Sequence, residues 1–308
     1  MTLVSQDKAK EAYDRIKKYG IYRASEQLGV SAESVARYAR FYKNSFLSPK
    51  KEARILFFDI ETAPLLAYVW SIWTEVRDFK FVEGDWYCLS WAAKWMGEDK
   101  IMCKALPDYG AYKKDIEDDS DLLKELWSLL DSADIVVAHN LKKFDERKIN
   151  ARFILNGMSP PSAYRCVDTL LEARRNFFFT SNRLDALGKM FGIGGKIDTG
   201  GFELWRQCML GDKKAWNTMK EYNMHDIVLL EAIYKELRPY MKSHPNMGIY
   251  NPEEGVCSKC GSTNIVETGK KVSTDVSQYD LYECRDCGAW SRGRNNTVDR
   301  KSILTKVS

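Results

Sequence analysis

The sequence lacks an apolar run of the roughly 20 residues that a membrane-spanning helix needs. Its first eight residues lack the apolar core of a signal peptide. It also lacks a Walker-type glycine-rich loop, an internal repeat and a low-complexity tract. We therefore expect neither a membrane protein nor a secreted one, and no use of ATP. The expectation that follows is a cytoplasmic protein.

Cysteine is sparse outside one region. Four of the eight cysteines are scattered through apolar segments, and we expect these to pack as small buried side chains: Cys88, Cys103, Cys166 and Cys208. The other four form two Cys-x2-Cys pairs, each followed by glycine: Cys257, Cys260, Cys284 and Cys287. A reducing cytosol leaves such thiols free for metal. Paired Cys-x2-Cys motifs are typical of one structural Zn²⁺ bound by four sulfurs, with rubredoxin-like iron as the minor alternative.

The 308 residues are enough for one large core and one or two small modules. We predict a helical module (1–45), a core domain (52–243), a four-cysteine unit (252–294) and a basic flexible tail (295–308). The net charge is only +4, but basic residues gather near both ends of the chain. This distribution is compatible with binding to a polyanion. Taken without other evidence, however, the charges fit an ordinary solvated surface better.

The N-terminal module has the pattern of a helix-turn-helix. Three helices are expected within residues 7–43, and a glycine-containing turn at 29–31 separates the last two. Ser31 is the expected N-cap of the third helix. Arg37 and Arg40 would then lie on the exposed face of that helix and contact DNA. A plain helical bundle or a dimerisation module is the alternative. The expected internal contacts are Ala24, Leu28, Val30 and Val35.

The core domain reads as a mixed α/β sheet flanked by helices, because three consecutive strands precede alternating helices and strands. The expected strands cover 54–60, 86–96, 100–106, 135–138 and 164–167. The expected helices cover 121–132, 145–156, 169–176, 183–191 and 215–240. Aromatic residues crowd the stretch 68–95, and we expect most of them to pack in the core of the sheet. Tyr68, Trp70 and Trp73 have the alternative of stacking on nucleobases.

Two carboxylates, Asp59 and Glu61, stand at the end of the buried strand that begins near Ile55. Side chains two residues apart on a strand point to the same face, so folding places these two acids side by side next to the core. Like charges that lose hydration repel each other unless a cation lies between them. A hard divalent ion such as Mg²⁺ or Mn²⁺ would meet that need. The pair therefore indicates a metal site.

Two further acids occupy suitable places. Asp145 follows a short buried strand and opens a helix, where the helix dipole favours a carboxylate. On its own it fits a simple N-cap. Asp226 lies within the apolar stripe of the last long helix, and no Lys or Arg of that stripe can pair with it. Tyr222 is one turn earlier, so its hydroxyl can lie beside Asp226. Singly, Tyr222 fits a core aromatic, and Asp226 fits an acid bonded to backbone or water.

Together the motifs run Asp-x-Glu, Asn-x4-Asp and Tyr-x3-Asp over residues 54–240. This pattern resembles the DEDD superfamily of 3′–5′ exonucleases, which have the ribonuclease H-like fold. The last motif resembles the tyrosine subclass, DEDDy, which includes proofreading domains of family-A and family-B DNA polymerases. The histidine subclass carries histidine where this chain has Glu221. The segments also look like stand-alone nucleases of phage and bacterial genomes. The four-cysteine unit resembles a zinc ribbon.

The resemblance implies catalysis by two Mg²⁺ or Mn²⁺ ions about 4 Å apart. Asp59 would bridge both ions. Glu61 and Asp226 would bind the ion beside the attacking water, which the Tyr222 hydroxyl would position. Asp145 would reach the second ion, mostly through waters.

The resemblance also implies that the partner is nucleic acid, DNA rather than RNA, in the cytoplasm of a bacterium or a phage-infected host cell. Asn140 and Phe144 would contact the terminal nucleotide. Replication or repair proteins are further candidate partners, and no membrane is expected. Two other functions stay open. One is a transposase- or integrase-like nuclease of the same fold, whose last acid is usually a Glu. The other is a DNA-binding regulator without catalysis.

Overall fold

The computed structural model describes residues 6–42, 52–73, 75–76, 78–251, 255–299, 301 and 303–304. The chain separates into two compact units, Met1–Glu52 with Met247–Val256, and Ala53–Asn246 with Cys257–Ser308. The linker predicted over 44–53 falls almost wholly outside the described residues. No helix in the described part of the chain is both long and apolar enough to cross a membrane.

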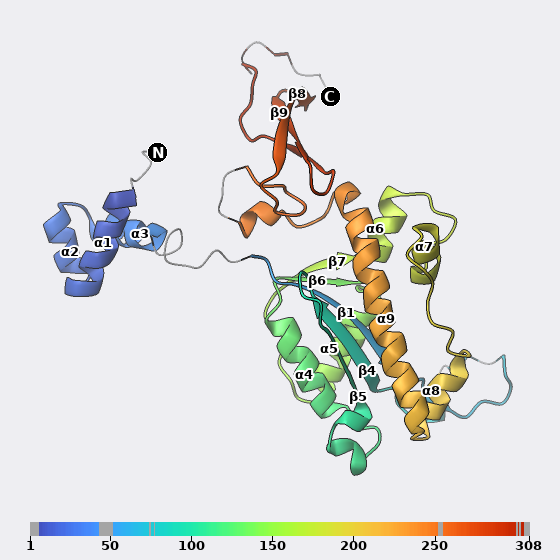
Figure 1. The fold of residues 1–308 in the computed structure, drawn as a ribbon. Coiled ribbons are helices and arrows are strands. Elements are labelled where there is room, and N and C mark those ends of the chain that lie inside the picture. The colour runs from blue at the N-terminus through green and yellow to red at the C-terminus, as the bar shows by residue number, and fades with distance from the viewer. Residues whose placement is uncertain are drawn as a thin grey trace. The chain divides into compact units, whose positions relative to one another are not determined.

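The first unit contains three helices, α1 (Gln6–Tyr19), α2 (Ile21–Leu28) and α3 (Ala32–Tyr42), which confirms the all-α N-terminal module (Figure 1). Gly29 ends α2 with φ 62°, a left-handed conformation that glycine adopts readily. Ser31 Oγ accepts a hydrogen bond from a backbone N–H in the first turn of α3 at 3.2 Å, as the predicted N-cap requires. The core contains the four expected residues and Ala12, Ile16 and Tyr38.

The second unit is built on a five-stranded mixed sheet with the order β5-β4-β1-β6-β7. The strands are β1 (Ile55–Thr62), β4 (Cys88–Trp95), β5 (Ile101–Ala105), β6 (Ile135–Ala138) and β7 (Arg165–Asp168). β4 pairs antiparallel with β1 and with β5, whereas β6 pairs parallel with β1 and with β7. The predicted mixed sheet is confirmed, and β1 is its central strand.

Helices cover both faces of this sheet. Figure 1 shows α4 and α5 on one face and the long α9 on the other. The helices are α4 (Ser120–Asp131), α5 (Asp145–Leu155), α6 (Thr169–Asn176), α7 (Leu184–Met190), α8 (Phe202–Met209) and α9 (Lys213–Leu237). Sequence periodicity located all of them except α8. Short 3₁₀ helices lie at Phe79–Phe81, Leu106–Asp108, Ala111–Lys113, Arg238–Tyr240 and, in the first unit, Met247–Ile249.

The alternation of side chains along β1 sets the position of its acids. Phe57 faces α9, because its ring centroid lies 5.3 Å from that of Tyr234. Leu56 and Phe58 point to the opposite face of the sheet and are fully buried. Asp59 and Glu61 therefore share the α9 face with Phe57.

A hairpin joins β1 to β4 and contains the short strands β2 (Leu66–Ala67) and β3 (Val82–Gly84). The expectation that most aromatic residues of 68–95 pack in the sheet is wrong for this segment. The exposed members are Tyr68, Trp70, Trp73, Phe79 and Phe81. Only the aromatics at the end of the segment and in β4 are buried: Tyr87, Trp91 and Trp95. The buried aromatics thus belong to β4 and the residue before it, whereas the exposed ones belong to the hairpin.

The C-terminal part of the same unit is a three-stranded antiparallel sheet with the order β10-β9-β8. Its strands are β8 (Ile265–Ser273), β9 (Gln278–Cys284) and β10 (Trp290–Arg292). Among the scattered cysteines, Cys88 and Cys208 are buried, whereas Cys103 and Cys166 are half-buried. Burial raises the pKa of Cys208 to about 12, so this thiol stays protonated at neutral pH.

Candidate active site and metal centres

The side chains of Asp59 and Glu61 lie on the face of β1 that packs against α9. Small residues of β4 lie opposite both of them. The register pairs Asp59 with Ala92 and Glu61 with Ser90, which leaves room around the carboxylates. One carboxylate oxygen from each of these acids and one from Asp226 lie within 4.8 Å of one another. The structure thus brings together three of the four predicted acids.

Asp226 comes from α9, where it lies one turn after Tyr222. Its side chain is 1% exposed, and Tyr222 is also buried. Asp226 Oδ1 is buried and has no hydrogen-bond partner among the described residues. A buried carboxylate oxygen without a hydrogen-bond partner destabilises the folded state unless a ligand binds it. This atom therefore fits a metal ligand.

Asp145 stands apart from the group of three. It is the first residue of α5, and Phe144 occupies the N-cap position. The simple N-cap alternative for Asp145 is therefore wrong. Its Oδ1 is buried and, within the described part of the chain, lacks a hydrogen-bond partner. Burial and then the charge of Asp59 raise the pKa of Asp145 well above its usual value. The fourth acid therefore lies close enough to repel the others.

The electrostatics of this cluster favour a cation. Burial, followed by repulsion from Asp226, raises the pKa of Asp59 to about 7. Burial and the charge of Asp59 raise the pKa of Glu61 well above its usual value. Each shift means that the ionised form is destabilised in the folded protein. The donors are all carboxylate oxygens, the ligands that Mg²⁺ and Mn²⁺ prefer.

Lys196 is a further component that the sequence motifs missed. Its ammonium group donates a hydrogen bond to the Tyr222 hydroxyl oxygen at 2.7 Å and pairs with Asp226 Oδ2. Burial lowers its pKa, but the charge of Asp226 together with the hydrogen bonds to Asp226 and Tyr222 outweighs burial and leaves that pKa raised. The four acids would carry four negative charges when ionised and Lys196 carries one positive charge, so Lys196 does not replace divalent cations.

Asp226 therefore has a basic partner, but not one from its own helix. The stripe of α9 offers none, as predicted, but Lys196 comes from the loop between α7 and α8, 30 residues earlier in the chain. The spacing of residues along one helix does not indicate a partner that comes from another segment.

Three contacts fix the loop that carries Lys196. The backbone N–H of Lys196 donates to Asp185 Oδ1 at 2.7 Å, and His225 Nε2 lies 2.8 Å from the carbonyl oxygen of Gly195. Gly188 lets the loop approach α7, since a Cβ there would lie 2.4 Å from the Gly194 oxygen. His225 thus helps to hold this loop against α9.

Asn223 is a second residue of the site that the sequence motifs did not indicate. Its Nδ2 donates to Asp59 Oδ2 at 2.7 Å, and its Oδ1 accepts from Ser90 Oγ at 3.2 Å. The side chain is fully buried. Asn223 therefore fixes the orientation of the Asp59 carboxylate from α9.

A groove of about 850 Å³ is lined by the loop of Lys196 and by Asn140. Asn140 has φ 74°, and it is the one non-glycine residue with positive φ in the described ranges. Asp168 holds it there by accepting a hydrogen bond from its N–H at 3.1 Å. Such strain is found at functional sites. Arg174 and Arg183 line the same groove, and neither forms an ion pair with another described residue.

Phe144 is half-buried at the start of α5. Its ring centroid lies 5.4 Å from the ammonium of Lys148. Lys148 also donates to Thr62 Oγ1 at 3.1 Å, directly after Glu61 in sequence. Phe144 thus lies beside the end of β1 that carries the acids, as a contact to a terminal nucleotide requires.

His139 lies in the groove but is not available for proton transfer. Its Nδ1 and Nε2 lie 2.9 Å from Thr169 Oγ1 and from the carbonyl oxygen of Asn182, respectively. Burial lowers its pKa to about 4. The ring is therefore neutral at pH 7, with both nitrogens engaged.

The predicted contacts on α3 belong to the other compact unit. Arg37 is exposed, and its guanidinium lies 5.4 Å from the ring centroid of Tyr38. The side chain of Arg40 lies outside the described residues.

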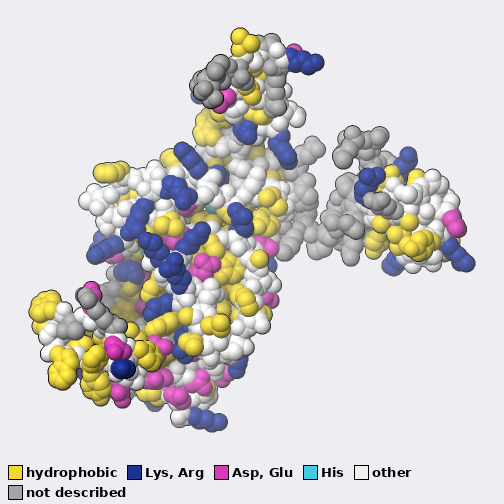
Figure 2. Space-filling model, turned by 180° about the vertical axis from the view of Figure 1, so that it is seen from behind, with side chains coloured by type: hydrophobic (Ala, Val, Ile, Leu, Met, Phe, Trp, Pro, Cys, Tyr) yellow, Lys and Arg dark blue, Asp and Glu magenta, His cyan; other side chains and the backbone are white. Residues whose placement is uncertain are grey.

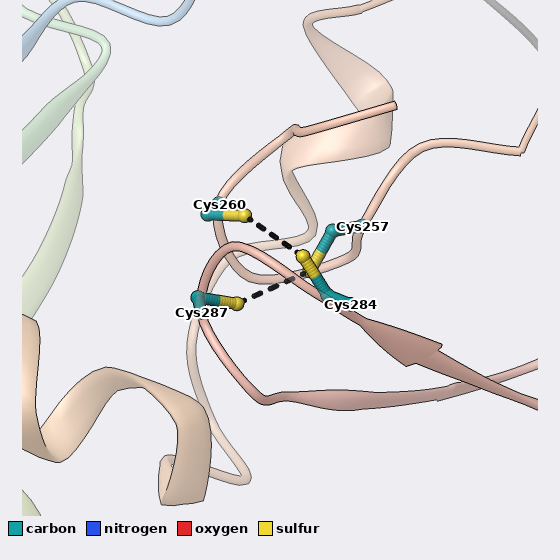
Figure 3. A group of neighbouring side chains, drawn as sticks. All are labelled: Cys257, Cys260, Cys284 and Cys287. Carbon is teal, nitrogen blue, oxygen red and sulfur yellow. Dashed lines mark hydrogen bonds between the residues drawn. The ribbon is translucent and has the colours of Figure 1, made fainter. Parts of the chain in front are cut away.

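The four C-terminal cysteines converge from two knuckles (Figure 3). Their sulfur atoms all lie within 4.8 Å of one another, with the Cys257–Cys287 and Cys260–Cys284 sulfurs 3.6 Å apart. Hydrogen bonding from Cys260 lowers the pKa of Cys257 to about 4, so this thiol ionises readily. Four converging sulfurs fit a tetrahedral structural Zn²⁺ site.

Comparison with known proteins gives a match to one family model and similarity to solved structures. Residues 102–238 match the sequence model of the RNase_H superfamily, a stretch that includes Asp145, Tyr222 and Asp226 but begins after Asp59 and Glu61. A solved family B DNA polymerase from the hyperthermophilic archaeon Pyrobaculum calidifontis is 13% identical, with a TM-score of 0.44, over 74% of this chain and 32% of that chain. The chain thus spans about a third of that polymerase.

No curated protein matches the sequence. Residues 102–238 are thus similar to the RNase_H superfamily, and β6 and β7 of the mixed sheet lie within that stretch.

Proposed function

We propose that the protein is a metal-dependent 3′–5′ exonuclease of the tyrosine DEDD subclass, which hydrolyses phosphodiester bonds of DNA. The observation that carries this proposal is the meeting of Asp59, Glu61 and Asp226 within 4.8 Å. Tyr222 lies one turn from Asp226. Asp145 is buried close enough to Asp59 for the charge of Asp59 to raise the pKa of Asp145. The superfamily match supports nuclease chemistry on this fold.

The carboxylates of Asp59, Glu61, Asp145 and Asp226 would bind two divalent ions. Such ions lower the pKa of water and stabilise the charge on the leaving oxygen. The Tyr222 hydroxyl accepts a hydrogen bond from Lys196 beside Asp226, and we infer that this hydroxyl orients the attacking water. No histidine is needed as a base.

Two flanking modules complete the proposal. We infer that residues 1–45 are a helix-turn-helix module, that 52–243 form the nuclease domain, and that 252–294 form a zinc ribbon with one structural Zn²⁺. Each module would bind DNA in addition to the nuclease domain. The protein would act with replication or repair proteins. The cysteine geometry supports the zinc site, and the core of the three helices supports the first module.

The direct test is incubation of end-labelled oligonucleotides with the full chain and Mn²⁺. Single-stranded DNA, duplex DNA and RNA would be compared, each labelled in turn at either end. We expect mononucleotides released from the 3′ end of DNA. Joined strands would indicate the transposase-like alternative. Tight binding without any cleavage would indicate the regulator.

Lys196→Met removes the charge of this side chain while it keeps most of the length. We expect kcat to fall about 10- to 100-fold, because a hydrogen bond to a charged group is worth about 1.5–3 kcal/mol. Steady-state rates of nucleotide release measure this. Lys124→Met is the control, since that ammonium pairs with Asp121 on the surface of α4 at 2.8 Å. A kcat equal to wild type would leave Lys196 with a purely structural role.

The double variant Arg174→Ala/Arg183→Ala tests the groove as the path of the substrate phosphates. Each phosphate contact contributes about −0.7 to the slope of log K against log salt for single strands, so we expect the slope to flatten by about 1.4. The measurement is the affinity for a single-stranded oligonucleotide in EDTA at several salt concentrations. Arg206→Ala is the control, because Arg206 pairs with Glu203 at 3.0 Å. An unchanged slope would place the strand elsewhere.

A further inference from the structure

The hairpin between β1 and β4 carries the most exposed indole rings in the described part of the chain. Trp70 and Trp73 are 93% and 90% exposed, and Tyr68 and Phe79 are exposed beside them. We call residues 64–85 the aromatic hairpin. Figure 1 shows this segment, in light blue, projecting from the body of the second unit, and Figure 2 shows hydrophobic side chains gathered on the projection. An apolar patch of this kind usually marks an interaction site.

The aromatic hairpin also encloses a hollow. Its volume is about 380 Å³, within the usual range for ligand pockets. The apolar part of its lining comes from Tyr68, Val69, Trp70, Trp73, Val76 and Phe81. Planar rings that line an open hollow provide the surfaces on which nucleobases stack.

The base of the hairpin is fixed to the strand that carries the acids. Ala63 N–H donates to the Tyr87 carbonyl oxygen at 2.9 Å, and Tyr68 N–H donates to the Phe81 carbonyl oxygen at 2.9 Å. Trp70 follows Glu61 by nine residues, so at most about 30 Å of extended chain separates the two. A strand with its end at the acids can therefore reach the hairpin within a few nucleotides.

The charges around the hollow decide which part of a nucleic acid would face it. Glu75 and Asp78 line the hollow, and carboxylates repel phosphates but accept hydrogen bonds from the amino groups of bases. Two exposed arginines, Arg174 and Arg183, line the groove that Asn140 and Lys196 also line. Figure 2 shows Lys and Arg side chains gathered above the projection.

We propose that the aromatic hairpin is a stacking site for unpaired nucleobases of the substrate strand, with Trp70 and Trp73 as its principal surfaces. The inference rests on the proposed function, because it takes the substrate of the acids to be nucleic acid. It goes further by assigning a second binding site that requires unpaired bases. The site recognises base planes and tolerates any sequence, since every base offers a π-face.

The test measures binding of a fluorescent single-stranded oligonucleotide to the full chain in EDTA, where hydrolysis is prevented. The variants are Trp70→Ala/Trp73→Ala, the same pair changed to Phe, and the same pair changed to Leu. Tyr240→Ala, an exposed aromatic outside the hairpin, is the control. An abasic oligonucleotide of equal length keeps the phosphates and removes the bases.

We expect the Ala pair to weaken binding of the normal oligonucleotide about 100-fold, or about tenfold for each ring. The Phe pair should keep most of the affinity, and the Leu pair should lose it as the Ala pair does. The abasic strand should bind wild type and the Ala pair equally weakly. Hairpin-dependent binding by a wild-type chain that never cleaves would uphold this inference and reject the proposed function.

Equal affinity of the Ala pair and wild type would overturn the inference, and cleavage by wild type in that case would leave the proposed function standing. Wild-type affinity in the Leu pair would also overturn it, because the patch would then act as a plain apolar surface suited to a protein partner. The substituted side chains are exposed, and unchanged thermal unfolding of the Phe pair would show that the fold is kept.

Discussion

Asp59→Asn should lower the rate of phosphodiester hydrolysis at least about 10³-fold while it stabilises the protein in the absence of divalent metal. The rate falls because Asp59 is the proposed common ligand of both ions, which contribute several kcal/mol to the transition state. Stability rises because the substitution removes a buried charge that Asp226 repels. The amide can still pair with Asn223, which donates to Asp59 Oδ2 at 2.7 Å in the structure.

The pH dependence gives the sign of this effect. The folded-state pKa of Asp59 is about 7, above its ordinary value of 3.8, so the folded protein binds more protons than the unfolded chain between these values. Stability without metal should therefore fall as pH rises from about 4 to about 7. We expect Asp59→Asn to be about 2–4 kcal/mol more stable than wild type at pH 8, with little difference at pH 4.

Urea unfolding in EDTA between pH 4 and pH 8 measures this difference, and nucleotide release with Mn²⁺ measures the activity. Glu221→Gln is the matched control, because Glu221 is exposed on α9 next to Tyr222 and occupies the histidine position of the other subclass. It should change neither quantity. An active Asp59→Asn protein would contradict the catalytic role of Asp59. A variant less stable than wild type at pH 8 would show that the acids do not repel each other as described.

Removal of the C-terminal metal should unfold the four-cysteine unit. Its buried core consists of Cys257, Cys284 and Ala289, which is too little apolar surface to hold a fold. Structural zinc contributes about 10–16 kcal/mol in comparable small domains. We expect Cys287→Ala to lose the metal and to become sensitive to proteases between residues 255 and 299.

One zinc ion per chain should be found by elemental analysis of wild type, and none in Cys287→Ala. Cys103→Ala is the control, since Cys103 is half-buried away from this cluster and should leave the zinc content unchanged. Iron in place of zinc would point to the rubredoxin-like alternative. A protease-resistant unit without any metal would contradict a structural metal site.

Local periodicity was enough to predict the acids of the site. The two-residue period of a buried strand placed Asp59 and Glu61 on one face, and the helical period put Tyr222 and Asp226 one turn apart. Each of these relations involves residues of a single element, so the sequence contains it directly. The same holds for the four cysteines, whose knuckles are local turns.

Residues that meet across elements escaped prediction. Lys196 reaches Asp226 from a loop 30 residues away, and Asn223 reaches Asp59 across the interface of α9 with β1. Neither has a spacing that marks it in advance. The aromatic hairpin escaped for a different reason. Its rings have the composition of a buried core, and nothing in the local pattern shows that Trp70 is 93% exposed in the connection between β1 and β4.

The most direct test of the metal-dependent site is a crystal soaked in Mn²⁺ and measured at the manganese absorption edge. We predict two anomalous peaks among Asp59, Glu61, Asp145 and Asp226, and Lys196 moved off the Asp226 oxygen that it occupies here. No peak among these carboxylates, with the ammonium of Lys196 still paired to Asp226, would contradict the account.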